Sequence, residues 1–387
     1  MKRDAPFIPN CIPNVGAAEA EAVREAVARG WLAAGPQIAQ FEQAITDYTG
    51  AAHGVALASG TAALHLALLV AGVKPGDAVL VPSLTFAATA NAVIYCGASP
   101  IFFDIERESW GVDSHQLAAY LANGCVAGDS RPIDAATGQR VGAIVPVHLY
   151  GHPAQIDTIA ELALQYDIPL IEDGAEALGA TYRGRPVGGD GRLCALSFNG
   201  NKIITGGNGG MVLTGNSELA DRIRYLSAQA KDDPVEFIHG EVGFNYRMPN
   251  LNAASAFAQT GRLEEFVDRK RAIVAAYDTA FEAIDGVAMR REAPWALSSH
   301  WMAMLTVDPA RRPDAIPGLA QHFRVHNIEA RPAWQPLHRQ PAFAKYKHLE
   351  ISVAEDVYRN SLCLPCSTGL SENQQRRVID AVSSFFQ

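Results

Sequence analysis

Two hydrophobic periodicities alternate along the first 215 residues of the chain. Short apolar runs typical of buried strands include HGVALAS at 53–59, AVLVPS at 78–83, SPIFFDI at 99–105, VGAIVPVHLYG at 141–151 and IPLIEDG at 168–174. Between them, apolar residues recur at helical spacing, as in GTAALHLALLVAG, FAATANAVIYCG and QIDTIAELALQYD. This β-then-α order predicts an α/β fold with a mainly parallel sheet and flanking helices.

The pattern changes after GFNYRMPN at 243–250. Residues 251–284, rich in Ala, Leu, Glu and Arg, predict one long helical region that contains the domain transition. The remainder predicts a smaller α+β unit. Its last helix starts with the capping box Ser371-x-x-Gln374 and buries a helical stripe made of Val378, Ile379, Val382, Phe385 and Phe386. We therefore expect a large α/β domain over 1–260 and a smaller domain over 261–387.

Composition and charge narrow the class of partner. The chain has 387 residues, of which 48% are hydrophobic and 19% are charged, as in an ordinary globular protein. A net charge of −9 argues against a nucleic-acid binder, which needs a basic surface. An anionic ligand must therefore be held by local backbone amides and a few cations.

Neither a signal peptide nor a membrane span is predicted. The N-terminal MKRDAPFIPNCIPN has two basic residues but no apolar segment after them. The most apolar stretch, at 78–103, is interrupted before it reaches about 18 consecutive apolar positions. We therefore expect a cytoplasmic protein with no membrane partner. In that reducing compartment, Cys363 and Cys366 are expected to be ordinary thiols, and no metal site is predicted.

The stretch SFNGNKIITGGNGG at 197–210 sets a lysine ahead of several glycines. One interpretation is a β-hairpin, with Asn199-Gly200 as its turn and the apolar runs at 194–196 and 203–204 as its strands. The other is that Lys202 is a functional side chain, to which the small neighbours Gly206 and Gly207 leave room to move. These residues alone favour the hairpin, so the rest of the chain has to decide.

Other segments with informative chemistry follow predicted strands, and in open α/β sheets ligands collect at the carboxyl ends of the strands. At Ser59-Gly60-Thr61 a strand gives way to a helix, whose free amides form a ready phosphate site. The alternative is a serine that only caps the helix. Phe86 follows the next strand, where its ring either stacks on a planar ligand or belongs to the core.

Asp173 ends the strongly apolar strand IPLIEDG, where an unpaired carboxylate would cost several kcal/mol. It therefore needs a cationic partner, unless it only caps a following helix. Glu176 would face the same side if a helical turn begins there.

A phosphate-binding helix end, a stacking aromatic, a buried carboxylate and a lysine are the groups that pyridoxal 5'-phosphate (PLP) requires. Its phosphate needs amides and hydroxyls, its pyridinium nitrogen needs a carboxylate, and its aldehyde needs a lysine for the Schiff base. Asp173 would find its counter-charge in the pyridinium. Taken together, these segments favour Lys202 as a functional residue over the hairpin interpretation.

With these segments in view, the chain resembles the DegT/StrS-type sugar aminotransferases, which have the aspartate-aminotransferase (fold type I) PLP architecture. The resemblance extends over nearly the whole chain. It is carried by GWLAAGPQIAQFE, ASGTAALHLAL, VPSLTFAATANAV, IEDGAEALGA, SFNGNKIITGGNGG and VGFNYRMPNLNAA. Two positions depart from the family pattern. Gly174 replaces a common alanine, which we expect to loosen packing, and Asn208 replaces a common glutamate or glycine.

The resemblance implies a role for each matching residue. Lys202 and Asp173 would be catalytic, Lys202 by forming the Schiff base and Asp173 by pairing with the ring nitrogen. The remaining cofactor contacts would be Gly60, Thr61 and Ser197 at the phosphate, Phe86 on the ring, Glu176 near the phenolic oxygen, and Asn245 reaching the cofactor of a second subunit. The active unit would then be a homodimer with shared active sites.

The substrate implied by the resemblance is a nucleotide sugar. The long segment at 123–153, with SFNGNK and NYRMPNLNAA, is most similar to aminotransferases of the legionaminic acid and bacillosamine pathways. These transfer an amino group from glutamate, through pyridoxamine 5'-phosphate, to C4 of a UDP-linked 4-keto-6-deoxy N-acetylhexosamine for surface glycans. Substrate contacts are expected from Arg247, Arg331, Trp334 and His338, the last three in a loop that could instead be structural.

Four alternatives remain open at this point. A GDP-perosamine-type synthase has similar motifs, and an amino-acid aminotransferase shares the cofactor residues. A PLP-dependent sugar dehydratase of this fold would normally carry histidine in place of Lys202. A cofactor-free binding protein is disfavoured, because both Lys202 and Asp173 are present.

Overall fold

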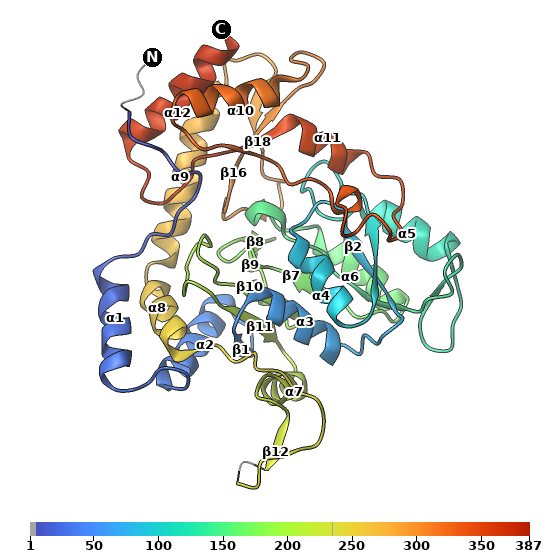
Figure 1. Cartoon of the computed structure of the whole chain (residues 1–387). Coiled ribbons are helices and arrows are strands. Elements are labelled where there is room, and N and C mark those ends of the chain that lie inside the picture. Colours follow the sequence, from blue (N-terminus) through green and yellow to red (C-terminus); the bar gives the residue numbers. More distant parts are fainter. Residues whose placement is uncertain (1–4, 234) are drawn as a thin grey trace.

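The computed structural model describes residues 5–233 and 235–387; the two basic residues of the N-terminal stretch, Lys2 and Arg3, and residue 234 lie outside the described part. Its centre is a mostly parallel sheet in the order β3-β2-β6-β7-β10-β11-β1 (Figure 1). Parallel bridges Ile144–Leu170 and Val147–Asp173 join β6 to β7, and β11 runs antiparallel to both of its neighbours. The strands are β1 (His53–Leu57), β2 (Ala78–Pro82), β3 (Ser99–Phe103), β6 (Val141–Ile144), β7 (Ile171–Asp173), β10 (Leu193–Ser197) and β11 (Gly210–Thr214). The predicted fold class is confirmed.

The apolar strand runs are continuous because both faces of the sheet are buried. In β2, Val79 and Val81 enter one core while Ala78 and Leu80 enter another. Successive side chains of a strand point to opposite faces, so a strand covered on both sides needs apolar residues at every position.

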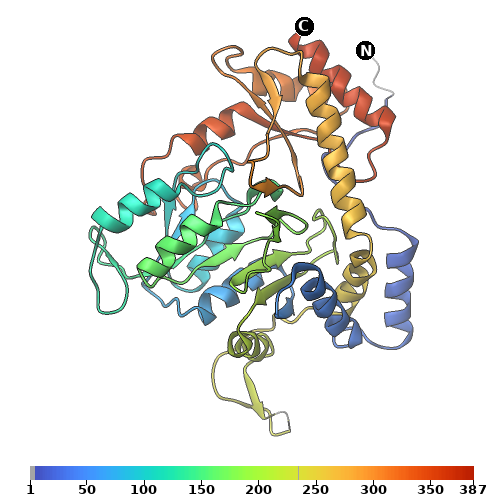
Figure 2. The ribbon, with the colours of Figure 1, turned by 180° about the vertical axis from the view of Figure 1, so that it is seen from behind.

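Helices cover the two faces of this sheet. Figure 1 shows α3 and α4 in front of the strands, and Figure 2, turned by 180°, brings α5 and α6 to the front. The first face carries α3 (Gly60–Val70), α4 (Ala87–Tyr95) and α7 (Ser217–Ser227), and the other carries α5 (Ser114–Asn123) and α6 (Ile156–Gln165). Beside the sheet, α1 (Ala17–Ala28) and α2 (Pro36–Thr49) pack on α8 (Asn250–Thr260).

The C-terminal part forms a second, smaller sheet in the antiparallel order β14-β16-β18-β17. Its elements are α9 (Leu263–Phe281), β14 (Val287–Met289), β16 (Ala303–Val307), α10 (Ala315–Val325), β17 (Arg331–Pro332), α11 (Val353–Asn360), β18 (Ser361–Leu364) and α12 (Glu372–Phe386). Ile8, from the other end of the chain, joins this core and pairs with Ile328. The N-terminal segment therefore packs into the C-terminal part, although the predicted boundary assigns it to the large domain. The domain boundary at 260/261 stays a prediction.

Short elements complete the described chain. They are β4 (Cys125–Val126), β5 (Ile133–Asp134), η1 (Leu149–Gly151), β8 (Thr181–Tyr182), β9 (Arg185–Pro186), β12 (Lys231–Asp233), β13 (Ile238–His239), β15 (Ala296–Leu297) and η2 (Leu337–Arg339). The β12–β13 pair projects from the body of the molecule beyond α7 (Figure 1). Among the helices of the described residues, none is long and apolar enough to cross a bilayer.

Three local expectations can be checked against these elements. The capping box at Ser371 and Gln374 is present and begins α12. The helical region at 251–284 is wrong as a single helix, because α8 ends at Thr260 and α9 starts at Leu263. The short hairpin around Asn199-Gly200, which the sequence analysis disfavoured, is not formed: β10 pairs with β11 across the whole glycine-rich loop, and residues 203–204 are not a strand.

Candidate active site

A cavity of about 460 Å³ lies between the strand ends of the central sheet and the C-terminal unit. Its walls also include Asn10 and Cys11 from the N-terminal segment. Most of the sequence-predicted site residues line it, namely Gly60, Thr61, Phe86, Asp173, Glu176, Ser197, Lys202, Arg331 and Trp334. The topology thus gathers at one place residues that are up to 274 positions apart in the chain.

The N-terminus of α3 opens into this cavity. The side chain of Ser59 accepts a hydrogen bond from the amide of Ala62 at 3.1 Å, so Ser59 is indeed a cap. The amides of Gly60 and Thr61, in the first turn, have no intrahelical acceptor and remain for a ligand. Gly60 also lies against β10, since a Cβ atom there would be 2.9 Å from the Cβ of Ser197. Capping and anion binding are therefore compatible here.

Asp173 ends β7 and is buried, with 5% of its surface exposed. Its Oδ2 accepts a hydrogen bond from Thr89 Oγ1 at 2.7 Å, and its Oδ1 accepts one from the amide of Ala175 at 3.1 Å. Burial raises the pKa of this carboxyl group above its ordinary value, against the effect of these donors. Within residues 5–233 and 235–387, no cation forms an ion pair with it. A cationic ring nitrogen would supply the missing charge.

Behind Asp173 lies a buried pair that the sequence analysis missed. His148 Nδ1 accepts a hydrogen bond from the amide of Ala154, which leaves Nε2–H to donate to Glu172 at 2.8 Å. Glu172 also accepts from Arg192 Nε at 2.8 Å. The backbone amide of His148 donates to the carbonyl of Asp173, so this network fixes the strand end that carries the carboxylate.

Glu176 follows in the turn after β7 and is buried. Its Oε2 accepts a hydrogen bond from the backbone amide of Tyr150 at 2.8 Å. Tyr150 has a left-handed backbone conformation, with φ of 57°. Burial raises the pKa of Glu176 to about 7 although Lys202 opposes the shift. This carboxyl group can therefore hold or release a proton near neutral pH.

Lys202 reaches into the cavity from the glycine-rich loop. Its Nζ lies 3.5 Å from Glu176 Oε1 and 3.6 Å from the centre of the Trp301 ring. Burial lowers the pKa of this amine, an effect opposed by Glu176 and Asp173. The amine is thus more easily deprotonated than that of an exposed lysine, as a nucleophile or base requires.

The glycines on this loop do not leave room for the lysine as expected. A Cβ atom on Gly206 would lie 2.5 Å from the backbone oxygen of Asn252, and the amide of Gly207 donates to Thr205. Gly206 therefore serves the packing of the loop against α8, whereas Gly207 has a φ of 79°, a left-handed conformation that favours glycine. Gly174, which stands where relatives commonly have alanine, does not loosen packing either, because a Cβ atom there would lie 2.7 Å from Cys194 Sγ. Asn208 lines the cavity.

Aromatic side chains form another part of the cavity wall. Phe86 keeps 58% of its surface exposed, because it faces the open cavity, and its ring lies 5.4 Å from that of Trp334. Phe86 is thus a wall residue and not a core residue. Tyr150 connects Trp334 to the central sheet, since its hydroxyl accepts a hydrogen bond from the Trp334 amide at 2.9 Å.

Three predicted site residues lie outside the cavity lining of their own chain. Asn245 is exposed, and Arg247 pairs through its backbone with Leu57. The His338 ring forms a hydrogen bond with Ser83 Oγ at 2.7 Å and lies 3.3 Å from Glu355. For His338, the structure thus supports the alternative in which the residue has a structural role. The segment at 123–140 also lies outside the lining and folds into the β4–β5 hairpin.

Besides the buried pair behind Asp173, three further residues that matter to the site were missed. Thr89 and Tyr150 follow the ends of β2 and β6, so the rule that ligands collect at strand ends could have found them. Trp301 lies between β15 and β16, far along the chain from any strand end of the central sheet. No sequence signal would have placed it against Lys202.

The residues present fit PLP. The helix end at Gly60 and Thr61 with Ser197 suits a phosphate, and Phe86 provides a ring face. Asp173 is a buried carboxylate that lacks a cation among the described residues, as a pyridinium partner should be. Lys202 brings a largely buried amine into the same cavity, with 13% of its side chain exposed. Each function that the cofactor needs is supplied by one part of the lining.

Comparisons with known proteins agree with this chemistry. A model of the DegT/DnrJ/EryC1/StrS aminotransferase family matches residues 13–383. The chain is 37% identical over 379 residues to EpsN of Bacillus subtilis (strain 168), covering 97% of this chain and 94% of EpsN. It is 36% identical over 384 residues to the GDP-perosamine synthase of Caulobacter vibrioides, covering 98% of each.

Solved structures give the same result. The structure of DesV from S. venezuelae matches with a TM-score of 0.86 and 30% sequence identity, over 97% of this chain and 99% of DesV. The aminotransferases of this family depend on PLP. The chain therefore belongs to the DegT/DnrJ/EryC1/StrS aminotransferase family and is a PLP-dependent aminotransferase of the nucleotide-sugar type.

Proposed function

We propose that this enzyme transfers an amino group from glutamate to C4 of a UDP-linked 2-acetamido-2,6-dideoxy-hexos-4-ulose, giving a 4-amino-4,6-dideoxy sugar for a surface glycan. The observation that carries the aminotransferase chemistry is that Lys202 meets the buried carboxyl groups of Asp173 and Glu176 in one cavity. The sugar is supported by the resemblance of SFNGNK and NYRMPNLNAA to aminotransferases of the bacillosamine and legionaminic acid pathways.

When bound, PLP accepts the amino group from the donor and stabilises negative charge on the carbon that loses a proton. The protein groups have distinct tasks around it. Asp173, oriented by Thr89 and the Ala175 amide, keeps a proton on the ring nitrogen. Lys202 Nζ, made more easily deprotonated by burial, removes a proton from one carbon and returns it to another.

Glu176 is placed to assist Lys202. The carboxyl group lies 3.5 Å from Lys202 Nζ, and its pKa of about 7 lets it stabilise the ammonium when ionised. The amide of Tyr150 holds the other carboxyl oxygen, so the carboxyl group keeps its orientation. The aromatic wall of Phe86, Tyr150 and Trp334 limits the access of water to these groups.

The anionic part of the substrate has few cations available in the described lining. Arg331 is one of them, and it already pairs with Glu329. Arg247 lies outside the lining of its own chain, so a contribution from it would come through the partner of a dimer. This arrangement suits a substrate whose binding depends on stacking and amide contacts as much as on ion pairs.

A second candidate is GDP-perosamine formation, in which the same C4 amination occurs on a GDP-linked 4-keto-6-deoxy sugar. It is favoured by the 36% identity to the Caulobacter vibrioides perosamine synthase over nearly the whole chain. In the long segment at 123–153, residues 123–140 lie outside the cavity and only Val147 and Tyr150 line it, so this segment is a weaker argument for the UDP sugar.

A substrate panel tests the proposal. Purified enzyme with glutamate would be offered the UDP-linked N-acetylated 4-keto sugar, the GDP-linked 4-keto-6-deoxy sugar, and a 2-oxo acid without a nucleotide. The formation of 2-oxoglutarate is the readout, and the UDP sugar should give the highest kcat/KM. A preference for the GDP sugar would overturn the sugar assignment only. Turnover of the 2-oxo acid alone would overturn the nucleotide-sugar function.

A trapping experiment tests the lysine separately. Borohydride reduction of the enzyme with bound PLP should leave the cofactor covalently attached to Lys202, as peptide mass spectrometry would show. Lys202→Ala should abolish turnover and still bind PLP through the helix end and Asp173. Attachment to any other lysine would contradict the assignment of Lys202.

A further inference from the structure

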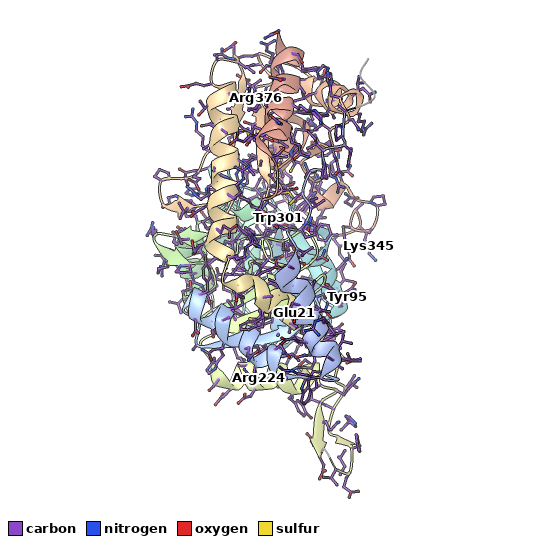
Figure 3. The ribbon with its side chains drawn as sticks, turned by 90° about the vertical axis from the view of Figure 1, so that its left-hand side faces the viewer. Glu21, Tyr95, Arg224, Trp301, Lys345 and Arg376 are labelled. Atoms are coloured by element: carbon purple, nitrogen blue, oxygen red, sulfur yellow. The ribbon has the colours of Figure 1, made fainter. Side chains whose placement is uncertain are left out.

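Trp301 occupies a place in the cavity that the proposed chemistry has not used. It is buried, with 3% of its surface exposed, and its ring centre lies 3.6 Å from Lys202 Nζ. Figure 3 shows it in the middle of the molecule, beside α9 and between the two sheets. A cation over the face of an indole ring is attracted by the ring's quadrupole, most strongly where water is excluded. The lysine amine is thus in contact with the aromatic surface best suited to hold it.

Trp301 is held through its indole N–H and through its backbone carbonyl, so its position is set by the fold and not by the lysine. Its Nε1 donates a hydrogen bond to the carbonyl of Asn201 at 2.8 Å, on the residue before Lys202. Its own carbonyl accepts a hydrogen bond from Lys270 Nζ of α9 at 2.9 Å. The Tyr150 ring lies nearly parallel to the Trp301 ring, with 6.5 Å between ring centres and an interplanar angle of 16°.

We propose that Trp301 is a positioning residue for Lys202, whose free ammonium it holds beside Glu176 whenever the amine is not joined to the cofactor. The lysine then stays within reach of the carbon from which it takes a proton, instead of withdrawing along the loop. This inference rests on the proposed function, because it assumes that Lys202 alternates between a bound and a free state.

The groups that act on the Lys202 charge come from two parts of the chain. Asp173 ends β7 and Glu176 lies in the turn after it, and Cys11 comes from the N-terminal segment; these three favour the ammonium. Lys270 Nζ is engaged elsewhere, by the backbone carbonyls of Trp301 and Cys366. Removing the Trp301 ring should therefore weaken the ammonium state of Lys202 through loss of the contact between the amine and the ring face.

The test measures the ionisation of Lys202 directly in the full-length chain freed of cofactor. A small amine-specific reagent would be applied between pH 6 and 10, and modification of Lys202 would be quantified by peptide mass spectrometry relative to the exposed Lys345. Replacing Trp301→Leu should lower the apparent pKa of Lys202 by about one unit, which corresponds to about tenfold faster modification at the same pH. Trp301→Phe, which keeps a ring but loses Nε1–H, should give an intermediate value.

Trp334→Leu is the matched control, because it removes an indole from the same cavity that does not lie over Lys202 Nζ. It should leave the Lys202 titration unchanged. If Trp301→Leu does not fold, fluorinated tryptophan can be incorporated instead, into the native chain and into the Trp334→Phe variant. Fluorination keeps the shape of the indole ring but weakens its quadrupole. In both proteins it should lower the pKa of Lys202.

An unchanged Lys202 titration in Trp301→Leu or in the fluorinated protein would overturn the inference, as would an equal shift in Trp334→Leu. These outcomes differ from failure of the proposed function. If borohydride attaches the cofactor to Lys202 while the Trp301 variants titrate normally, only the role of Trp301 is wrong. If the cofactor attaches elsewhere, the proposed role of Lys202 fails first, and the inference about Trp301 fails with it.

Discussion

At the scale of single residues, Asp173 is held by two donors but lacks a cation among the described residues. Asp173→Asn should keep PLP attached to Lys202 and reduce kcat by about 10²- to 10³-fold, since a neutral amide cannot keep the ring nitrogen protonated. Thr89→Val, which removes the donor to Oδ2 together with the hydrogen bond between Thr89 and Thr85, should cost about 10-fold or slightly more. Steady-state kinetics with the borohydride assay checks both. Equal losses in the two variants would show that the hydrogen bond, not the charge, is what matters.

Glu176 makes the stability of the cofactor-free chain depend on pH. Burial raises its pKa from 4.5 to about 7. Its contribution to stability is therefore complete below pH 4.5 and is lost as the pH rises through 7, because the folded chain binds the proton more tightly than the unfolded chain. The loss is about 3 kcal/mol at most. Glu176→Gln should lack this decline in urea unfolding between pH 4.5 and 8; a decline equal to that of the native chain would contradict the raised pKa.

Arg331 is the residue-scale test of substrate binding. Arg331 lines the cavity and forms an ion pair with Glu329. It should therefore contribute about equally to the binding of the substrate and to that of the transition state. Arg331→Ala should raise KM for the nucleotide sugar about tenfold and change kcat less. Arg376→Ala, on the exposed side of α12 far from the cavity, is the control and should change neither constant (Figure 3). A fall in kcat without a change in KM would assign Arg331 a different role.

At the scale of elements, the contact of α3 with β10 forms the phosphate end of the cavity. Gly60→Ala would bring a Cβ atom to 2.9 Å from Ser197 Cβ and push the helix end from the strand. PLP affinity should fall about tenfold or more, because overpacking at a closely fitted contact costs about 1–3 kcal/mol. Gly261→Ala is the matched control: no atom lies within 4 Å of the added Cβ, and its φ of −67° is helical.

The Gly261→Ala control should bind PLP normally. Its free energy of unfolding should be unchanged or higher by about 0.4–1 kcal/mol, because alanine restricts the unfolded chain. Spectroscopic PLP titration and urea unfolding separate the two effects. Normal PLP affinity in a folded Gly60→Ala variant would show that the α3 end is not the phosphate site.

At the scale of the whole molecule, Asn245 and the nearby β12–β13 pair lie outside the cavity. Apolar side chains are exposed along this projection, with exposed fractions of 78%, 65%, 55% and 86% for Val235, Phe237, Ile238 and Val242. Such an exposed cluster indicates an interface. We expect a homodimer in which each chain lends Asn245 to the site of its partner.

Complementation checks this expectation. Mixing inactive Lys202→Ala chains with inactive Asn245→Ala chains should restore about a quarter of native activity, since half of a random mixture is heterodimer and one of its two sites is intact. Lys202→Ala mixed with Asp173→Asn is the control and should show no rescue, because both residues line the cavity of their own chain. No rescue in confirmed Lys202/Asn245 heterodimers would place Asn245 in its own chain's function.

The sequence by itself determined the local elements and most of the cavity lining. Strand runs such as AVLVPS are apolar at every position because both faces are buried, and that pattern can be read without coordinates. Ser59, Phe86, Asp173 and Lys202 could be found because parallel strands bring their carboxyl ends to one edge, so chain order predicts spatial proximity.

Only the tertiary structure decided which side chains touch across the two sheets. Trp301 reaches Lys202, and His338 binds Ser83, through contacts between segments that no short-range period relates. The split at Gly261 and the packing roles of Gly174 and Gly206 were likewise set by neighbours distant in sequence. Local patterns reflect the exposure of each residue, whereas the identity of its neighbour depends on how the whole chain packs.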